Sequence, residues 1–345
     1  MQKKCFGRII LILTLLAVAL LTVSCKDGKE KKKDNKQIVL TTGFEENELF
    51  RINDCKCYLP EAKVYIRTLA TNYDSLYGPD IMNVRVNDMK VEDKLNSVAM
   101  SRLATVKAMV LLAADRGITL TERDEARCAN AAETFINSLS PADRRDLGVD
   151  KELVTSMYRD YALSNKVYED ITGDINPEIS DDEARIITIK RILIKSTDQA
   201  NAMQIADSLR SVAMEGSDFD TLVDEYNEGE ESVYSFGKDT SLFPTEFVDA
   251  CFALSTGDIS GVIVTDEGCS VVKCLSSFDM EETDANKERI VKERKNKAFE
   301  DIYSAFVKDL ITSFNQELWN VSQLNDKPLD SKDNFFLIYD DIFSI

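Results

Sequence analysis

The chain has 345 residues, a length that corresponds to two domains or possibly three. Hydrophobic residues make up 44% and charged residues 30%, and the 13 glycines and 6 prolines are too few for a collagen-like, low-complexity or mostly disordered chain. The net charge of −19 leaves no basic face for a phosphate backbone, which argues against a nucleic-acid partner. Because the chain contains no histidine, histidine-dependent nucleophiles, a histidine general base and histidine-ligated zinc are all excluded.

The first 24 residues have the pattern of a secretory signal peptide. Lys3, Lys4 and Arg8 precede an apolar run, residues 9–23, that is shorter than a membrane-spanning helix requires. The run ends in Leu-Thr-Val-Ser-Cys at residues 21–25, which resembles a bacterial lipobox. This resemblance implies that residues 1–24 are removed and that Cys25 is lipidated and becomes the mature N-terminus. The alternative is an ordinary signal peptide with an incidental Cys25.

Residues 25–37 are predicted to form a flexible basic tether. Six lysines and three acidic residues lie in residues 26–36, and the segment holds no apolar side chain. Residues 37–345 carry a net charge of −25, so an anionic lipid surface would repel the folded part of the chain. A membrane is therefore an expected partner through the lipid anchor alone.

Six further cysteines fit no disulfide framework in a chain of this size. The pair Cys55 and Cys57 has neither a second cysteine pair nor a histidine with which to complete a zinc site. We therefore expect buried free thiols, no metal and no cofactor.

Residues 38–178 are predicted to form a mainly helical segment. Short β-prone runs at 38–40 and 49–52 precede a helix that opens at Pro60. Apolar residues then recur at helical spacing over 95–113, with Gly117 placed to end that helix, and Thr121 begins a second helical pattern. A third helix is predicted over 153–168.

The character of the sequence changes after a turn-rich hinge at 174–180. Residues 184–278 are predicted to form one α/β domain in the order β-α-α-α-β-β. The expected strands are 186–194, 259–264 and 269–274, and the expected helices are 202–212, 219–226 and 246–254.

A single long helix is predicted over residues 283–325, followed by a tail, 326–345, with an apolar run. The apolar stripe of this helix must be buried, and the helices before residue 174 are its natural partner. We therefore expect an α+β chain in which a helical domain, built from N- and C-terminal segments, is interrupted by the α/β domain. Docking of the tail on the helical domain is an expectation whose role the sequence does not indicate.

Residues 184–276 resemble the parvulin family of peptidyl-prolyl isomerases. The resemblance rests on five motifs in order: Arg-Ile-Leu-Ile at 191–194, Gly-Ser-Asp-Phe at 216–219, Ser-Phe-Gly at 235–237, the segment from Phe247 to Ser260, and Gly-Cys-Ser-Val-Val-Lys at 268–273. With the lipoprotein start and the flanking helices, the whole chain resembles a PrsA-type foldase lipoprotein, whose layout SurA-type chaperones share.

The resemblance implies an extracytoplasmic foldase that binds unfolded exported polypeptides, including proline-containing segments. It places the protein on the outer leaflet of the cytoplasmic membrane, or on the periplasmic face in a cell with two membranes. A homodimer remains an open alternative.

The catalytic positions of the parvulin family are altered in this chain. The two facing histidines of the family fall on Arg191 and Ser270, and its Asp or Cys falls near Gly229 or Glu230. Neither Arg191 nor Ser270 reproduces a neutral imidazole pair, so we expect weak or absent isomerase activity. Pairing of Glu230 or Glu231 with Arg191 is a further expectation.

The resemblance also predicts a prolyl pocket formed by Phe236, Phe243 and Phe247, with Phe252 beneath it, and a rim that includes Thr265 and Glu267. The alternative is that these four phenylalanines are core, which we favour for Phe252.

Two other functions are alternatives to a chaperone whose catalytic positions are degenerate. The first is a competent isomerase that relies on the apolar pocket alone. The second is a solute-binding lipoprotein of a transporter, which is disfavoured because only one β-α unit is visible in the sequence.

Overall fold

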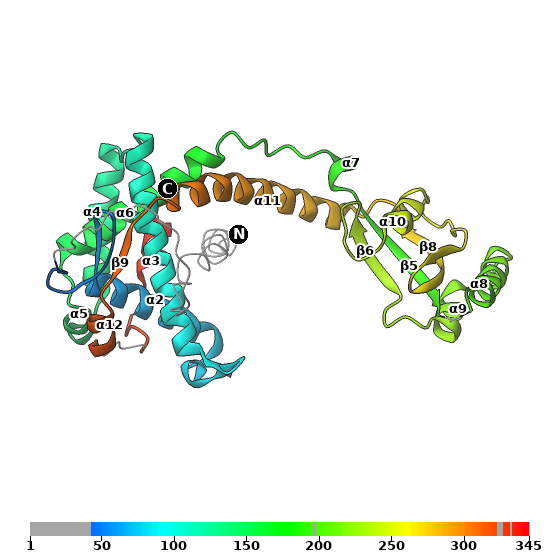
Figure 1. Cartoon of the computed structure of the whole chain (residues 1–345), viewed down its shortest axis with the longest axis horizontal. Helices are drawn as coiled ribbons and strands as arrows, with labels where there is room; N and C mark the ends of the chain where they lie inside the picture. The colour runs from blue at the N-terminus through cyan, green and yellow to red at the C-terminus, as the bar shows by residue number, and fades with distance from the viewer. Residues whose placement is uncertain (1–42, 196–197, 323–326, 332, 345) are drawn as a thin grey trace, which may run out of the picture. The chain divides into compact units, whose positions relative to one another are not determined.

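The computed structural model describes residues 43–195, 198–322, 327–331 and 333–344 (Figure 1). The predicted signal peptide, tether, lipidated Cys25 and strand 38–40 lie outside these residues. The chain divides into two compact units, the first formed by residues 1–174 and 296–345 and the second by residues 175–295. The fold is mixed α+β, which confirms the predicted fold class.

The first unit, here called the helical unit, is built around long helices. Its elements are β1 (Glu48–Ile52), β2 (Cys55–Tyr58), α2 (Leu59–Tyr77), η1 (Ile81–Asn83), β3 (Arg85–Val86), β4 (Met89–Lys90), α3 (Val91–Arg116), α4 (Glu122–Ser138), α5 (Pro141–Leu147), α6 (Lys151–Thr172), the last part of α11 (Met280–Val307), β9 (Thr312–Phe314), α12 (Gln316–Val321) and α13 (Phe335–Phe343).

Local sequence signals set the ends of the helices as predicted. Gly117 adopts a left-handed conformation with φ of 69°, and its N–H closes the end of α3. The Thr121 side chain accepts from the backbone N–H of Asp124, while the Asp124 carboxylate accepts from the N–H of Thr121, so a capping box starts α4. Within the described residues, α3 alone is long and apolar enough to cross a membrane, but 67% of its apolar window is buried, as in a core helix.

The predicted continuous helix over 283–325 is wrong beyond Val307. Helix α11 ends there, and residues 312–314 form β9, which pairs antiparallel with β1 through Phe50 and Phe314. At the start of this pairing Asn53 donates its backbone N–H to the carbonyl of Ile311 at 2.8 Å. Apolar residues in this stretch fit a helical period, but pairing with the exposed edge of β1 satisfies the backbone of 312–314 instead. The resulting sheet, in the order β2-β1-β9, joins the two ends of the chain.

The C-terminal tail is part of the core of the helical unit. Phe335 is fully buried, and its ring centroid lies 4.1–6.1 Å from five other rings, those of Tyr65, Phe135, Tyr158, Tyr161 and Phe336. The Tyr158 hydroxyl donates to the Phe335 carbonyl at 3.0 Å. Burial, together with the charge of Asp341, raises the pKa of Asp340 in the same helix to about 6. The tail therefore completes the core rather than covering its surface.

A buried arginine fixes the segment that leads into this tail. The Arg67 guanidinium lies 2.5 Å from Asp143 and 3.0 Å from Asp146, and it also donates to the carbonyls of Lys327 and Pro328. Asp143 in turn accepts from the backbone N–H of Asp330. These bonds compensate the burial of both charges.

The second unit, here called the α/β unit, is organised around an antiparallel sheet in the order β6-β5-β8-β7 (Figure 1). Its elements are α7 (Asp181–Ala184), β5 (Ile186–Ile194), α8 (Gln199–Met214), α9 (Phe219–Tyr226), β6 (Val233–Gly237), α10 (Thr245–Phe252), β7 (Ile263–Thr265), β8 (Gly268–Ser276) and the first part of α11.

One strand of this sheet was missing from the predicted order. Residues 233–237 form β6, which pairs with β5 through Phe236 and Ile187, so a strand separates the second and third helices. The Ser-Phe-Gly motif lies in this segment, and the segment also shows the alternation of polar and apolar residues that is the signature of a strand. The omission matters because β6 brings Phe236 onto the same sheet face as Ile187.

The two faces of the sheet bury separate cores. Helices α8 and α9 cover the face that carries Ile192 and Ile194, and α10 covers the face that carries Ile187 and Ile189. This alternation follows from the two-residue period of β5 and places Arg191 on the α10 side.

The hairpin between β7 and β8 depends on Gly268. Its φ is +142°, and a Cβ at this position would lie 2.2 Å from the carbonyl oxygen of Ile194. Only glycine fits this close approach of two backbones.

Candidate functional site

Arg191 and Ser270 meet on the α10 face of the sheet. They lie on the paired strands β5 and β8, and Arg191 Nε donates to Ser270 Oγ at 2.9 Å. Both residues are buried, with exposed fractions of 3% and 0%. The two residues predicted to stand at the histidine positions of the parvulin family are thus in direct contact.

Glu267 provides the carboxylate that pairs with Arg191. Its Oε2 lies 2.9 Å from Arg191 Nη2, and its side chain is largely exposed in the turn after β7. The expected partner Glu230 is exposed, and within the described residues neither it nor Glu231 forms an ion pair with Arg191, so that prediction is wrong. The reason is geometric, because the short β7–β8 turn returns Glu267 directly beside the guanidinium.

An aromatic cluster lies beside Arg191. The Arg191 guanidinium carbon lies 5.1 Å from the ring centroid of Phe247 and 5.4 Å from that of Phe243. These two rings stack at 4.5 Å, and Phe243 also contacts Phe236 at 5.2 Å and Tyr234 at 5.0 Å. The geometry is that of a cation–π interaction supported by an ion pair.

The phenylalanines predicted to hold a prolyl ring are mostly buried. Phe247 is fully buried and Phe236 is 4% exposed, whereas Phe243 is half-buried. Phe252 is also half-buried, with the Arg185 guanidinium 4.9 Å from its ring centroid. The Arg191 side chain and Phe243 therefore cover the ring of Phe247, on which the prolyl pocket was centred.

Two further residues complete the description of the site: Thr265, which was predicted, and Tyr234, which was not. Thr265 is half-buried, and its hydroxyl donates to the carbonyl of Gly268 at 3.4 Å, closing the β7–β8 turn. Tyr234 joins the aromatic cluster but was not predicted, although its place in the alternating pattern of β6 could have identified it. Its hydroxyl donates to the carbonyl of Glu231.

The site holds no imidazole for proton transfer near neutral pH. The Arg191 guanidinium offers donors and no acceptor, and Ser270 is a hydroxyl that accepts from it. Burial raises the pKa of the nearby Cys251 thiol to about 12, so this thiol stays neutral. What the arrangement provides is a fixed cation, an exposed carboxylate and a partly accessible aromatic ring.

Comparison with known proteins agrees with the motifs described above. Residues 186–276 match the sequence family described as "Rotamase: PPIC-type PPIASE domain". The chain is 25% identical over 325 residues to the foldase protein PrsA of Caldanaerobacter subterraneus, covering 87% of this chain and 94% of that protein.

The solved structures found to be similar include two groups of proteins. The crystal structure of the peptidylprolyl isomerase PrsA from Bacillus cereus is 15% identical, with a TM-score of 0.34 over 71% of this chain and 88% of that one. A structure described among SurA-like chaperones of Campylobacter jejuni is 12% identical, with a TM-score of 0.28 over 79% of this chain and 100% of that one. The resemblance predicted from the sequence is confirmed: the chain is similar to a PrsA foldase over most of its length, and residues 186–276 match the PPIC-type peptidyl-prolyl isomerase domain.

Proposed function

We propose that this PrsA-like foldase is a membrane-anchored extracytoplasmic chaperone that binds unfolded exported polypeptides and whose isomerase domain catalyses prolyl rotation weakly or not at all. The observation that carries the proposal is the network of Arg191, Ser270 and Glu267, in which Arg191 and Ser270 are the residues that the sequence resemblance aligns with the family's imidazole pair. The absence of histidine from the whole sequence removes any substitute imidazole.

The chemistry of isomerisation explains why this network argues against efficient catalysis. Rotation about an X-Pro bond must overcome the loss of amide resonance, so a site helps by holding proline in an apolar pocket and stabilising the twisted amide. Here the guanidinium of Arg191 lies against Phe247 and Phe243, where a prolyl ring would need to enter. Entry would cost the cation–π contact and uncover a buried, paired charge.

An assay of prolyl isomerisation tests the catalytic half of the proposal. The full chain and a histidine-containing parvulin as positive control would be compared on a proline-containing peptide whose cis–trans exchange takes tens of seconds without catalyst. We expect little acceleration by this protein, together with suppressed aggregation of an unfolded test protein. Acceleration matching the positive control, and lost on Phe243→Ala, would instead establish a competent isomerase that uses the apolar pocket.

A double substitution distinguishes two possible causes of low isomerase activity, the loss of the imidazoles and the occlusion of the pocket by Arg191. Arg191→His combined with Ser270→His restores the family's residue types and removes the cation from the ring faces. A gain in isomerisation rate in this variant, but not in Arg191→Leu, would identify the lost imidazoles as the cause of low activity. Equal gains in both variants would identify occlusion by Arg191 as the cause.

The anchoring half of the proposal rests on the sequence of residues 1–37. A basic start, a short apolar run and a lipobox-like Cys25 support a lipid anchor on the outer leaflet of the cytoplasmic membrane, or on the periplasmic face in a cell with two membranes. Cys25→Ser is expected to block lipid attachment and membrane retention, as measured by metabolic labelling with a fatty acid and by cell fractionation. Unchanged labelling of that variant would remove the anchor from the proposal.

A further inference from the structure

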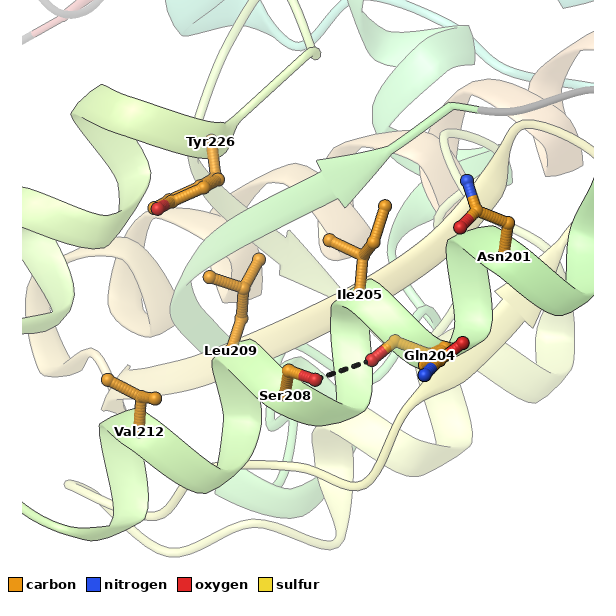
Figure 2. Close-up of a pocket in the computed structure, with 7 residues that line it drawn as sticks. All are labelled: Asn201, Gln204, Ile205, Ser208, Leu209, Val212 and Tyr226. Atoms are coloured by element: carbon orange, nitrogen blue, oxygen red, sulfur yellow. Dashed lines mark hydrogen bonds between the residues drawn. The ribbon is translucent and has the colours of Figure 1, made fainter.

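A hollow on the α/β unit lies on the face of the sheet opposite Arg191. It has a volume of about 470 Å³, is open to solvent, and is lined by α8 and by the last residue of α9, Tyr226. Figure 2 shows Ile205 and Leu209 on α8 directed toward Tyr226 across this hollow, here called the α8–α9 groove.

The lining of the α8–α9 groove combines exposed apolar groups with uncharged polar groups. Ile205, Val212 and Tyr226 are 36%, 41% and 44% exposed, and Leu209 forms a buried floor. The polar lining residues are Asn201, Gln204 and Ser208 (Figure 2). Such amides and hydroxyls can bond the backbone of a peptide while the apolar groups receive its side chains.

The chain segment that contains α8 and α9 is strongly acidic. Residues 198–231 contain ten acidic residues and one basic residue, Arg210. The Arg210 side chain donates to the carbonyl of Ser260, and Lys190, on β5, is paired with Asp220. Within the described residues, no ion pair engages Asp207, Asp224 or Glu225, so this segment keeps an excess of negative charge.

We propose that the α8–α9 groove binds segments of unfolded polypeptide in which apolar side chains are flanked by lysine or arginine. The apolar lining fits the aliphatic and aromatic side chains, and the excess negative charge of the segment that forms the groove favours the basic ones. This inference rests on the proposed function and specifies one class of segment that the chaperone recognises, at a place separate from the Arg191 face.

Binding of labelled peptides to the full chain tests this inference. The probe is a fluorescein-labelled, unstructured peptide of Leu, Tyr, Lys and Ser, and a second peptide carries Glu in place of Lys. The variant Ile205→Ser/Val212→Ser removes two exposed apolar groups from the groove. Its matched control, Met203→Ser/Met214→Ser, changes two exposed apolar residues of α8 that do not line the groove.

The expected results are quantitative. The groove variant binds the lysine peptide about tenfold more weakly than the unaltered chain, equivalent to about 1.4 kcal/mol, and the control variant binds it unchanged. The glutamate peptide binds the unaltered chain more weakly than the lysine peptide does. Asp224→Asn/Glu225→Gln also weakens binding and flattens its dependence on salt.

The outcomes separate this inference from the proposed function. Equal binding of the lysine peptide by the groove variant and the unaltered chain would overturn the groove proposal while leaving the chaperone function standing. Equal binding of the lysine and glutamate peptides would overturn the charge-based part of the specificity. If the unaltered chain neither binds the peptides nor suppresses aggregation, both proposals fail.

Discussion

Replacing Phe335 with alanine should remove a large part of the stability of the helical unit. The ring is fully buried and surrounded by five aromatic rings, one of which, Tyr158, stacks on it at 4.1 Å. The hydrogen bond from Tyr158 goes to the backbone carbonyl of Phe335, so the substitution removes the ring without removing an acceptor.

The expected loss follows from burial and from the cavity left behind. Truncating a buried Phe to Ala costs about 3–5 kcal/mol, the upper end applying where the surroundings cannot collapse. Rings held on α2, α4 and α6 are fixed by those helices, so we expect about 4 kcal/mol. Domains have total free energies of unfolding of about 5–15 kcal/mol. The loss of this single ring would therefore remove a considerable fraction of the stability of the helical unit.

The single tryptophan provides the assay. Trp319 lies in α12 and packs against the core of the helical unit, so its fluorescence reports the unfolding of that unit in urea. With a urea dependence of about 2 kcal/mol per M, the unfolding midpoint should fall by about 2 M. Leu76→Ala, at a residue of α2 that is 73% exposed, is the matched control and should change stability by less than about 0.5 kcal/mol. A midpoint shift as small for Phe335→Ala as for this control would refute the assignment of the tail to the core.

Three further predictions concern buried charge, pH and backbone geometry. Arg67→Met should destabilise the helical unit by about 3–5 kcal/mol in the same urea assay, because it leaves the Asp143 carboxylate buried and unpaired. The double variant Arg67→Met/Asp143→Leu should recover part of this loss of stability. Failure of the double variant to recover any stability would contradict the reasoning. The pKa of Asp340 rises from 3.8 when unfolded to about 6 when folded, so the folded chain holds this proton more tightly, and stability falls as pH rises through that window. Asp340→Asn should therefore raise the urea midpoint at pH 7 and leave it unchanged below pH 4, and an equal effect at both pH values would refute ionisation as the cause. Gly268→Ala should destabilise the α/β unit by more than about 2 kcal/mol, seen as faster amide hydrogen exchange in β5 and β8, whereas Gly261→Ala, where no atom lies within 4 Å of the added Cβ, should not.

Local signals in the sequence were sufficient to predict most of the helices. The capping box at Thr121 and the glycine at 117 act within one turn of backbone, so they can be read without knowledge of the rest of the fold. The end of the long helix could not be read in this way. Residues 312–314 form a strand because β1, more than 250 positions earlier in the sequence, offers them a partner, and no local period encodes that pairing.

In the site too, residues that belong to local motifs could be predicted from the sequence, whereas contacts between distant segments could not. The motifs singled out Arg191 and Ser270 as the residues aligned with the two histidines of the family, and the structure joins these two residues by a hydrogen bond. The carboxylate partner was predicted wrongly because Glu230, Glu231 and Glu267 are equivalent as residue types, and only the β7–β8 turn decides which of them reaches the guanidinium. The depth of Phe247 likewise depends on how α10 packs on the sheet, which composition does not reveal.

The place of Phe335 also bears on the order in which the molecule assembles. Phe335 follows the whole α/β unit in the sequence, so the core of the helical unit, which also contains Tyr65 of α2, stays open until residues 175–295 have been synthesised. Residues 175–295 form their own core, so they can fold while the site for the Phe335 ring is still empty. A product truncated before Phe335 would therefore expose an unfilled aromatic cavity and would be open to proteolysis.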